Sequence, residues 1–216
     1  MNRLILAFLL FLLSCAQVAT AAGAQADPPR ERGLSVEDSL QTLQKLTASV
    51  STLRCRFVQT TNIPLFTEPV ISRGFLLFAR PDSLLWEYSE PFAQGFALQG
   101  TKGFRWEGSR DSRVSLAATE DPVAGLVAAQ ALSWISFDRK WIEAHYAVRA
   151  EGQTPLLLVL TPKNAEMASV VSSISLSFAR DGIAREILLR EAGGGTTTIL
   201  LHDVVLNQPV GSEEFQ

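Results

Sequence analysis

The sequence contains only two cysteines and two histidines, and this scarcity restricts the chemistry that the chain can support. Cys15 lies in an apolar N-terminal segment, so the rest of the chain has Cys55 alone, which cannot form an internal disulfide. Cys55 falls in a strand-like alternation and is expected to be a small buried hydrophobe. His145 and His202 lack the spacing of metal ligands, and we expect both to be structural or exposed. The sequence therefore predicts no disulfide framework and no metal site.

Motifs of known catalytic machinery are also missing. There is no G-x-S-x-G elbow, no H-E-x-x-H, no P-loop and no cysteine cluster. The triplet Gly193-Gly194-Gly195 neither has phosphate-binding spacing nor opens a helix, and it is best interpreted as a hairpin turn. Acidic residues outnumber basic ones, with a net charge of −3, which argues against a nucleic-acid partner. We expect a protein that is not an enzyme, has no catalytic residues and needs no cofactor.

A long apolar run occurs only at the N-terminus, where residues 1–26 have the pattern of a cleaved signal peptide. Arg3 is the charged region, Leu4 to Leu13 the apolar region and Ala24-Gln25-Ala26 the cleavage site. The run is too short to cross a bilayer, which takes roughly 20 residues. Cleavage moves the net charge from −3 to −4 and leaves 190 residues, enough for one domain. An alternative is that Leu12-Leu13-Ser14-Cys15 is a lipobox, in which case Cys15 would be acylated and anchor the chain.

Residues 27–33 are polar and contain two prolines, so a flexible leader is expected before a single domain at 34–216. A capping pattern of Ser35 and Asp38 precedes apolar residues at helical spacing, which predicts an amphipathic helix to about Val50. Asp121-Pro122 predicts the start of a second helix through about Ser133. Period-two alternation with turn residues between the segments predicts strands at 53–60, 71–79, 84–88, 95–99, 103–107, 113–117, 145–151, 155–161, 170–179, 183–191 and 196–206.

This pattern of many strands and two helices predicts a mainly β (α+β) fold, in which a large, mostly antiparallel sheet curls on itself and the helices cover an opening. A small curled sheet either fills its interior or keeps a cavity, and the sequence favours a hydrophobic cavity. The helix from Pro122 to Ser133 is apolar almost all round and has Gln130 as nearly its only polar residue. It fits a lid between the sheet and an apolar ligand, or else an alanine-rich core helix.

The segment from Gly74 to Pro91 has one guanidinium, Arg80, at the end of an apolar run. Pro81, Asp82 and Ser83 supply turn chemistry, so two strands are expected to meet at this corner. A guanidinium in apolar surroundings needs acceptors, and the free carbonyls at the end of a lid helix would provide them, making Arg80 a breakable latch. The alternatives are a surface pair of Arg80 with Glu87 or Glu90, and a central strand in a packed core.

These segments, taken in order, resemble the LolA family of periplasmic carriers of outer-membrane lipoproteins. The resemblance rests on Phe57-Val58-Gln59, on the G-x-L-x-h-x-R-P-x-x-h-x-W pattern from Gly74 to Trp86 (h is apolar), on Gln99 to Trp106 and on Leu158 to Lys163. Gln99 stands where that hairpin usually has Asp, and the sequence ends at Phe215-Gln216 without the longer C-terminal extension, which suggests a divergent member.

The resemblance implies a carrier that binds the acyl chains of lipoproteins or related lipids and shuttles them from the inner to the outer membrane. Its implied partners are the acylated lipoproteins or lipids, an inner-membrane lipoprotein-releasing transporter and an outer-membrane receptor. It also implies an unclosed, strongly curved antiparallel β-barrel with an α-helical lid over a hydrophobic cavity, and that Arg80 is the lid latch. The alternatives are an outer-membrane-anchored acceptor with lipidated Cys15, and a partner-binding sensor or scaffold. The residues expected to line the acyl-binding cavity are Phe57, Leu76, Phe78, Leu84, Trp86, Tyr88, Leu126 and Val127.

Overall fold

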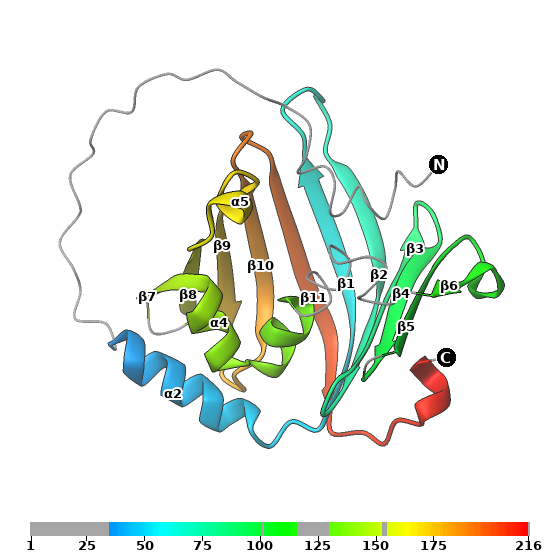
Figure 1. Cartoon of the computed structure of the whole chain (residues 1–216), viewed down its shortest axis with the longest axis horizontal. Coiled ribbons are helices and arrows are strands. Elements are labelled where there is room, and N and C mark those ends of the chain that lie inside the picture. Colours follow the sequence, from blue (N-terminus) through cyan, green and yellow to red (C-terminus); the bar gives the residue numbers. More distant parts are fainter. Residues whose placement is uncertain (1–34, 101, 116–129, 153–154, 216) are drawn as a thin grey trace.

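The computed structural model describes residues 35–100, 102–115, 130–152 and 155–215 (Figure 1). The predicted leader, Cys15, and the part of the second predicted helix that holds Leu126 and Val127 lie outside these residues. The helical elements are α2 (Val36–Thr47), residues 130–136, α4 (Arg139–His145), α5 (Ala165–Ala168), and the short 3-10 turns η1 (Arg110–Ser112) and η2 (Ser212–Phe215). The strands are β1 (Thr52–Asn62), β2 (Val70–Ala79), β3 (Ser83–Glu90), β4 (Gln94–Gln99), β5 (Lys102–Glu107), β6 (Val114–Ser115), β7 (Tyr146–Glu151), β8 (Leu156–Pro162), β9 (Val171–Phe178), β10 (Ala184–Glu191) and β11 (Thr196–Leu206).

All eleven strands form one antiparallel sheet in the order β6-β5-β4-β3-β2-β1-β11-β10-β9-β8-β7. The pairing of β1 with β11 brings the first and last strands together in the middle of the sheet. Within the described residues β6 and β7 remain the two edges, so the sheet is not closed. The mainly β fold and the unclosed sheet are confirmed. The strong curvature, the lid and the cavity stay predictions.

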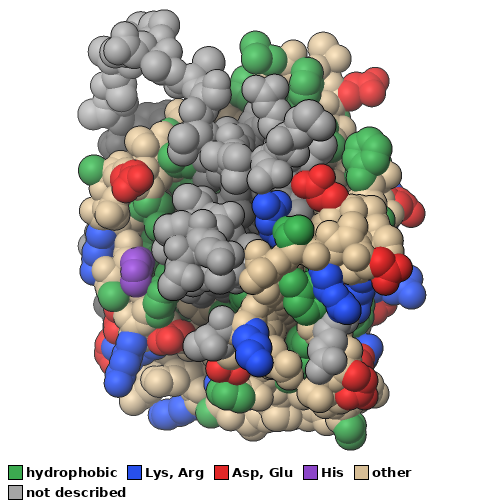
Figure 2. All heavy atoms as spheres, turned by 45° about the vertical axis from the view of Figure 1, so that its right-hand side comes forward, with side chains coloured by type: hydrophobic (Ala, Val, Ile, Leu, Met, Phe, Trp, Pro, Cys, Tyr) green, Lys and Arg blue, Asp and Glu red, His purple; other side chains and the backbone are tan. Residues whose placement is uncertain are grey.

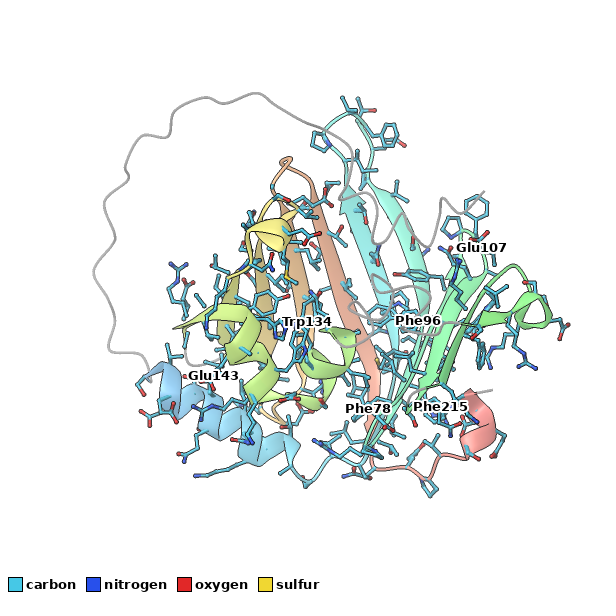
Figure 3. The ribbon with its side chains drawn as sticks, viewed as in Figure 1. Phe78, Phe96, Glu107, Trp134, Glu143 and Phe215 are labelled. Atoms are coloured by element: carbon cyan, nitrogen blue, oxygen red, sulfur yellow. The ribbon has the colours of Figure 1, made fainter. Side chains whose placement is uncertain are left out.

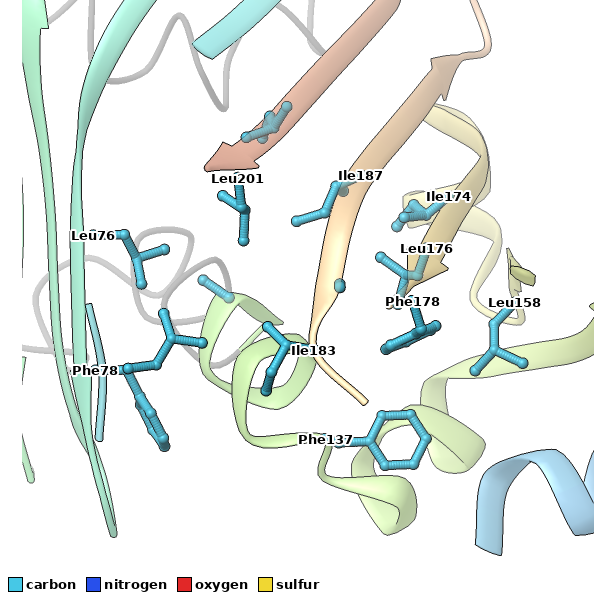
Figure 4. Packing of buried hydrophobic residues seen from close by; sticks show 14 of the residues in the cluster. Leu76, Phe78, Phe137, Leu158, Ile174, Leu176, Phe178, Ile183, Ile187 and Leu201 are labelled. Atoms are coloured by element: carbon cyan, nitrogen blue, oxygen red, sulfur yellow. The ribbon is translucent and has the colours of Figure 1, made fainter. Parts of the chain in front are cut away.

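One face of the sheet, which we call the inner face, is covered by helices and carries the main hydrophobic core. Leu76 and Phe78 of β2 lie in the same cluster as Leu176 and Phe178 of β9, and Phe137 lies among them (Figure 4). Ala131 and Ile142 bring the helical segment 130–136 and α4 into this cluster. Because side chains alternate along a strand, these buried residues follow one another at every second position.

The opposite, outer face of the sheet is also apolar, but only over β2 to β5. Leu77, Leu85, Ala97 and Trp106 form a second buried cluster, and Phe215 of η2 packs on it (Figure 3). The end of β2 that leads to Arg80 is therefore covered on both faces. Phe215 covers part of this outer cluster. No local sequence pattern indicated where its side chain would pack.

The first helix begins as the sequence predicts and ends slightly earlier. Ser35 Oγ accepts a hydrogen bond from the Asp38 N–H at 3.0 Å and donates one to the Asp38 carboxylate at 2.7 Å. Leu40 and Leu43 are buried on the helix face that meets the core. The helix ends at Thr47, before the predicted Val50.

A helix replaces the start of a predicted strand at residue 145. His145 is the last residue of α4, so the prediction of a strand from His145 is wrong by one residue, and the helix itself was missed. Asp138 caps this helix by accepting a hydrogen bond from the Trp141 N–H at 3.1 Å. Seven residues are too few to show a helical period. The cap was the only local signal for this helix. None of the helices in the described part of the chain is long and apolar enough to span a membrane.

Candidate functional site

The structure brings together all the predicted cavity residues that it describes. Their positions on β1, β2 and β3 belong to the inner-face cluster, and each is buried; they are Phe57, Leu76, Phe78, Leu84, Trp86 and Tyr88. Cross-strand register explains the grouping, since Leu76 lies opposite Trp86 and Phe78 opposite Leu84. A role of these residues in binding acyl chains stays a prediction.

Three aromatic rings form the centre of this group. The Phe57 ring lies 5.0 Å from that of Trp86 and 5.1 Å from that of Tyr88, measured between centroids. Gly74 lies opposite both Phe57 and Tyr88, and its missing side chain leaves the space that the Phe57 ring fills. The glycine at the start of the sequence signature therefore makes room for an aromatic side chain on the neighbouring strand.

The inner face becomes polar toward the β1–β2 turn. The Tyr88 hydroxyl donates to Gln59 Oε1 at 2.8 Å, and Gln59 Nε2 donates to Thr61 Oγ1 at 3.2 Å. Thr197 of β11 donates to the same Thr61 oxygen at 3.4 Å. Burial raises the pKa of Tyr88, so its hydroxyl remains a donor at ordinary pH. An amphiphile on this face would meet apolar side chains at the helix end and polar ones at the turn end.

Arg80 connects the sheet to the ends of two helices. Its Nε donates to the Val50 carbonyl at 2.7 Å, and its Nη2 donates to the Thr47 carbonyl at 3.0 Å and to the Ser136 carbonyl at 3.3 Å. Thr47 is the last residue of α2, and Ser136 is the last of the helical segment 130–136. Carbonyls at helix ends lack intrahelical partners, so the guanidinium satisfies groups that would otherwise need water.

The surroundings of Arg80 differ from those predicted. We expected Arg80 to lie in an apolar environment, but the residue is exposed. The prediction that its guanidinium is removed from water is therefore wrong. The alternative of a surface pair with Glu87 or Glu90 is also wrong, because Glu87 pairs with Arg110 and Glu90 with Arg73. The acceptors that the described residues offer Arg80 are backbone carbonyls, and water can reach this contact.

A second arginine joins two helices of the cover. Arg139 of α4 binds the Glu37 carboxylate of α2 through both terminal nitrogens, at 2.9 Å and 2.6 Å, and also pairs with Glu143. The hydrogen bonds from Arg139 lower the pKa of Glu37. Since Glu37 is exposed, the pair contributes little stability but fixes how α2 and α4 lie together.

The turn between β1 and β2 carries uncovered apolar side chains. Leu65 is 89% exposed and Phe66 60% exposed, and Val70 and Ile71 nearby are also exposed. Figure 2 shows hydrophobic side chains at the upper end of the molecule, where Figure 1 places this turn. The apolar pair Leu65-Phe66 within a turn is a signal that the sequence carries, and it was missed as an indication of an exposed apolar surface.

A groove of about 430 Å³ lies on the outer face of the other half of the sheet, over β7 to β10. Ser173, Ser175 and Ser177 of β9 form its floor, because they alternate with the buried Ile174 and Leu176. Aliphatic and charged residues of β7, β8 and β10 form its sides. Here the outer face has small polar side chains where β2 to β5 have a second core.

Among the described residues, no group of three or more His, Cys, Asp or Glu side chains has the arrangement of a metal site. Cys55 is buried beside Leu76, and burial raises the pKa of its thiol to about 12. His145 packs its ring on Trp141 at 4.1 Å, and His202 is exposed. The described histidines and the free cysteine therefore have structural or surface positions.

The thiol of Cys55 is expected to resist alkylation in the folded protein. The thiolate is the reactive form, and at pH 8 it is scarce when the pKa is about 12. Treatment with iodoacetamide should leave the native mass unchanged and add one label per chain in urea. Rapid labelling of the native protein would show that the inner face around Cys55 opens.

The model of the family "Outer membrane lipoprotein carrier protein LolA" matches residues 48–216. No curated protein matches the chain. A LolA superfamily protein from Nitrosomonas europaea has 12% identity, with 85% of this chain and 98% of that chain covered and a TM-score of 0.49. The Mycobacterium tuberculosis lipoprotein LppX has 12% identity, 82% and 99% coverage and a TM-score of 0.43. Pseudomonas aeruginosa MucB, solved with MucA, has 16% identity, 83% and 59% coverage and a TM-score of 0.39.

Proposed function

This chain belongs to the LolA family of outer membrane lipoprotein carrier proteins, and on that basis we propose that it carries acylated cargo across the periplasm. Members of the family are generally carriers without enzymatic activity and act in the periplasm or cell envelope. The proposed cargo is a lipoprotein or a related lipid, whose acyl chains would lie between the inner face of the sheet and the helices. An inner-membrane transporter would supply the cargo and an outer-membrane receptor would accept it.

The observation that supports this proposal most directly is the contact of Arg80 with the carbonyl ends of two helices beside an apolar sheet face. The inner face holds its own buried cluster beneath the helices, so cargo would have to displace the helices that cover it. Hydrogen bonds to exposed carbonyls are worth about 1 kcal/mol each, little enough to break during a transport cycle. Arg80 therefore fits a latch that holds the empty protein closed.

The energy of acyl burial agrees with this arrangement. Each CH₂ group removed from water contributes about 0.8 kcal/mol, so two or three long chains represent tens of kcal/mol. Release must then be coupled to entry into another apolar site. A closed empty state helps, because it buries the Phe57, Trp86 and Tyr88 rings once the cargo has left.

The test is the mass of the protein purified without detergent after expression with its own leader. We expect a denatured mass that begins at Asp27, and a native spectrum that contains an additional species with a bound acylated molecule. Native spectra recorded before and after delipidation provide the control.

Two results would contradict the soluble carrier. A diacylglyceryl group on Cys15 would identify the anchored acceptor. A chain that is always empty, and that stays empty when mixed with diacyl lipid, would favour the scaffold that binds a protein partner.

A further inference from the structure

A row of side chains crosses the inner face from β2 to β5 and ends in an arginine. Leu76 lies opposite Trp86, Trp86 opposite Phe96, and Phe96 opposite Arg105. Figure 3 places Phe96 on the side of β4 that faces the helices. An aliphatic and two aromatic side chains are therefore followed, on the same face, by a guanidinium.

The neighbours of Arg105 along β5 confirm that it faces inward. Phe104 packs on the outer cluster and Trp106 is part of it, so the residue between them points to the inner face. Arg105 is only partly exposed. Within the described parts of the chain, it has no ion pair, hydrogen bond or ring contact.

In contrast to Arg105, three arginines near the outer face of this half of the sheet have an ion-pair or aromatic partner. Arg54 pairs with Glu214 at 2.6 Å, Arg110 pairs with Glu87, and Arg113 lies 5.3 Å from the centre of the Phe104 ring. A half-buried guanidinium beside apolar side chains is costly unless an acceptor reaches it. An anionic ligand on the inner face would supply acceptors for Arg105 that the described residues do not.

A carboxylate follows on the same face. Glu107 is two residues beyond Arg105, opposite Gln94, and its position on β5 is labelled in Figure 3. Two residues along a strand separate the Cα atoms by about 7 Å. Within the described structure no ion pair joins these two side chains and Glu107 is exposed, so both charges remain available to a ligand.

We propose that Arg105 and Glu107 receive the head group of a zwitterionic phospholipid, with the phosphate on Arg105 and the ammonium on Glu107. This inference rests on the proposed lipid-carrier function and specifies its ligand. The acyl chains lie along the row of Phe96, Trp86 and Leu76. A guanidinium can bind phosphate oxygens through two parallel hydrogen bonds, and the ammonium neutralises the carboxylate that would otherwise repel the phosphate.

The two charges predict an order of preference. Phosphatidylethanolamine satisfies both residues and binds most tightly. Phosphatidylglycerol satisfies Arg105 but adds no cation for Glu107, so it binds less well. Diacylglycerol has neither charge and measures the contribution of the acyl chains alone.

The experiment measures binding of these three lipids, with identical acyl chains, to the delipidated mature protein by native mass spectrometry. We expect phosphatidylethanolamine to bind about tenfold more tightly than diacylglycerol, as one charged hydrogen-bonded contact would give. Arg105→Gln should remove this preference and leave diacylglycerol binding unchanged. Glu107→Gln should bring phosphatidylglycerol level with phosphatidylethanolamine. Arg56→Gln, an equal charge change at an exposed outer-face position of β1, should alter nothing.

The possible failures separate this inference from the carrier proposal. If none of the three lipids binds, the proposed function itself fails, and this inference with it. If all three bind equally and Arg105→Gln changes nothing, the carrier stands and the head-group site is overturned. An equal loss for all three lipids in Arg105→Gln would also overturn the site, because it would place Arg105 in packing.

Discussion

Replacing Gly74 by alanine is expected to lower the free energy of unfolding by about 3 kcal/mol or more, the upper range for overpacking a core. A Cβ atom at this position would overlap the backbone carbonyl oxygen of Glu87 and the ring of Phe57. The ring can move only into Trp86 and Tyr88, and the carbonyl belongs to the paired strand β3. Urea unfolding followed by tryptophan fluorescence measures the loss.

Gly193→Ala is the matched control for this change. Gly193 lies in the turn between β10 and β11, and an added Cβ there has no atom within 4 Å. The free energy of unfolding of the Gly193→Ala variant should therefore stay within about 0.5 kcal/mol of that of the parent protein. A Gly74→Ala variant that unfolds at the same urea concentration as Gly193→Ala would show that the strands around Phe57 are less tightly packed than the structure indicates.

Replacing Arg80 by leucine is expected to leave the fold intact and to slow cargo transfer about tenfold. The substitution removes the hydrogen bonds to the Thr47, Val50 and Ser136 carbonyls but keeps the backbone bond from Arg80 N to Ser51 O at 2.8 Å. Because water replaces part of these bonds at the exposed site, the closed, empty state would lose about 1.4 kcal/mol relative to the loaded state, less than three full hydrogen bonds, which corresponds to a tenfold change. Transfer of a fluorescent diacyl peptide from loaded protein to vesicles measures the rate.

The control for Arg80→Leu is Arg56→Leu, which makes the same substitution at another exposed arginine. Both variants should unfold cooperatively at similar urea concentrations, and only Arg80→Leu should release its cargo slowly. Equal transfer rates in the two variants would exclude the latch. A large loss of stability in Arg80→Leu would instead give the arginine a structural role.

Much of the sheet was predictable because its strands alternate strictly and its turns carry glycine, proline or aspartate. The expected strand at 71–79 is β2 (Val70–Ala79), and the expected 196–206 is β11 (Thr196–Leu206). The turn between β9 and β10 also shows this chemistry, because Gly182 has a φ of 80° and the Asp181 side chain accepts a hydrogen bond from the Ile183 N–H. Strand alternation and turn residues are local properties of the chain, so they can be identified from the sequence alone.

The sequence could predict which residues of the site share a face of a strand, but not which separate elements meet there. Residues at every second position of a strand share a face, which places Leu76, Phe78 and Trp86 together, and the structure puts them in one cluster. This alternation could not show that Arg80 meets two helix ends, since its contacts with Thr47 and Ser136 span 33 and 56 residues. The same limit hid the pairing of Arg139 with Glu37, which depends on how separate helices pack.

The outer cluster around Phe215 makes the two halves of the sheet mechanically unequal. The outer apolar cluster covers β2 to β5, and β2 to β4 also pack on the inner cluster, whereas β8 to β10 have a serine-floored groove on their outer face. The part of a sheet that is packed on both faces resists bending, whereas a part that is packed on one face can bend more easily. We infer that the molecule would swell around cargo by yielding on the groove side, with β2 to β5 as its fixed frame.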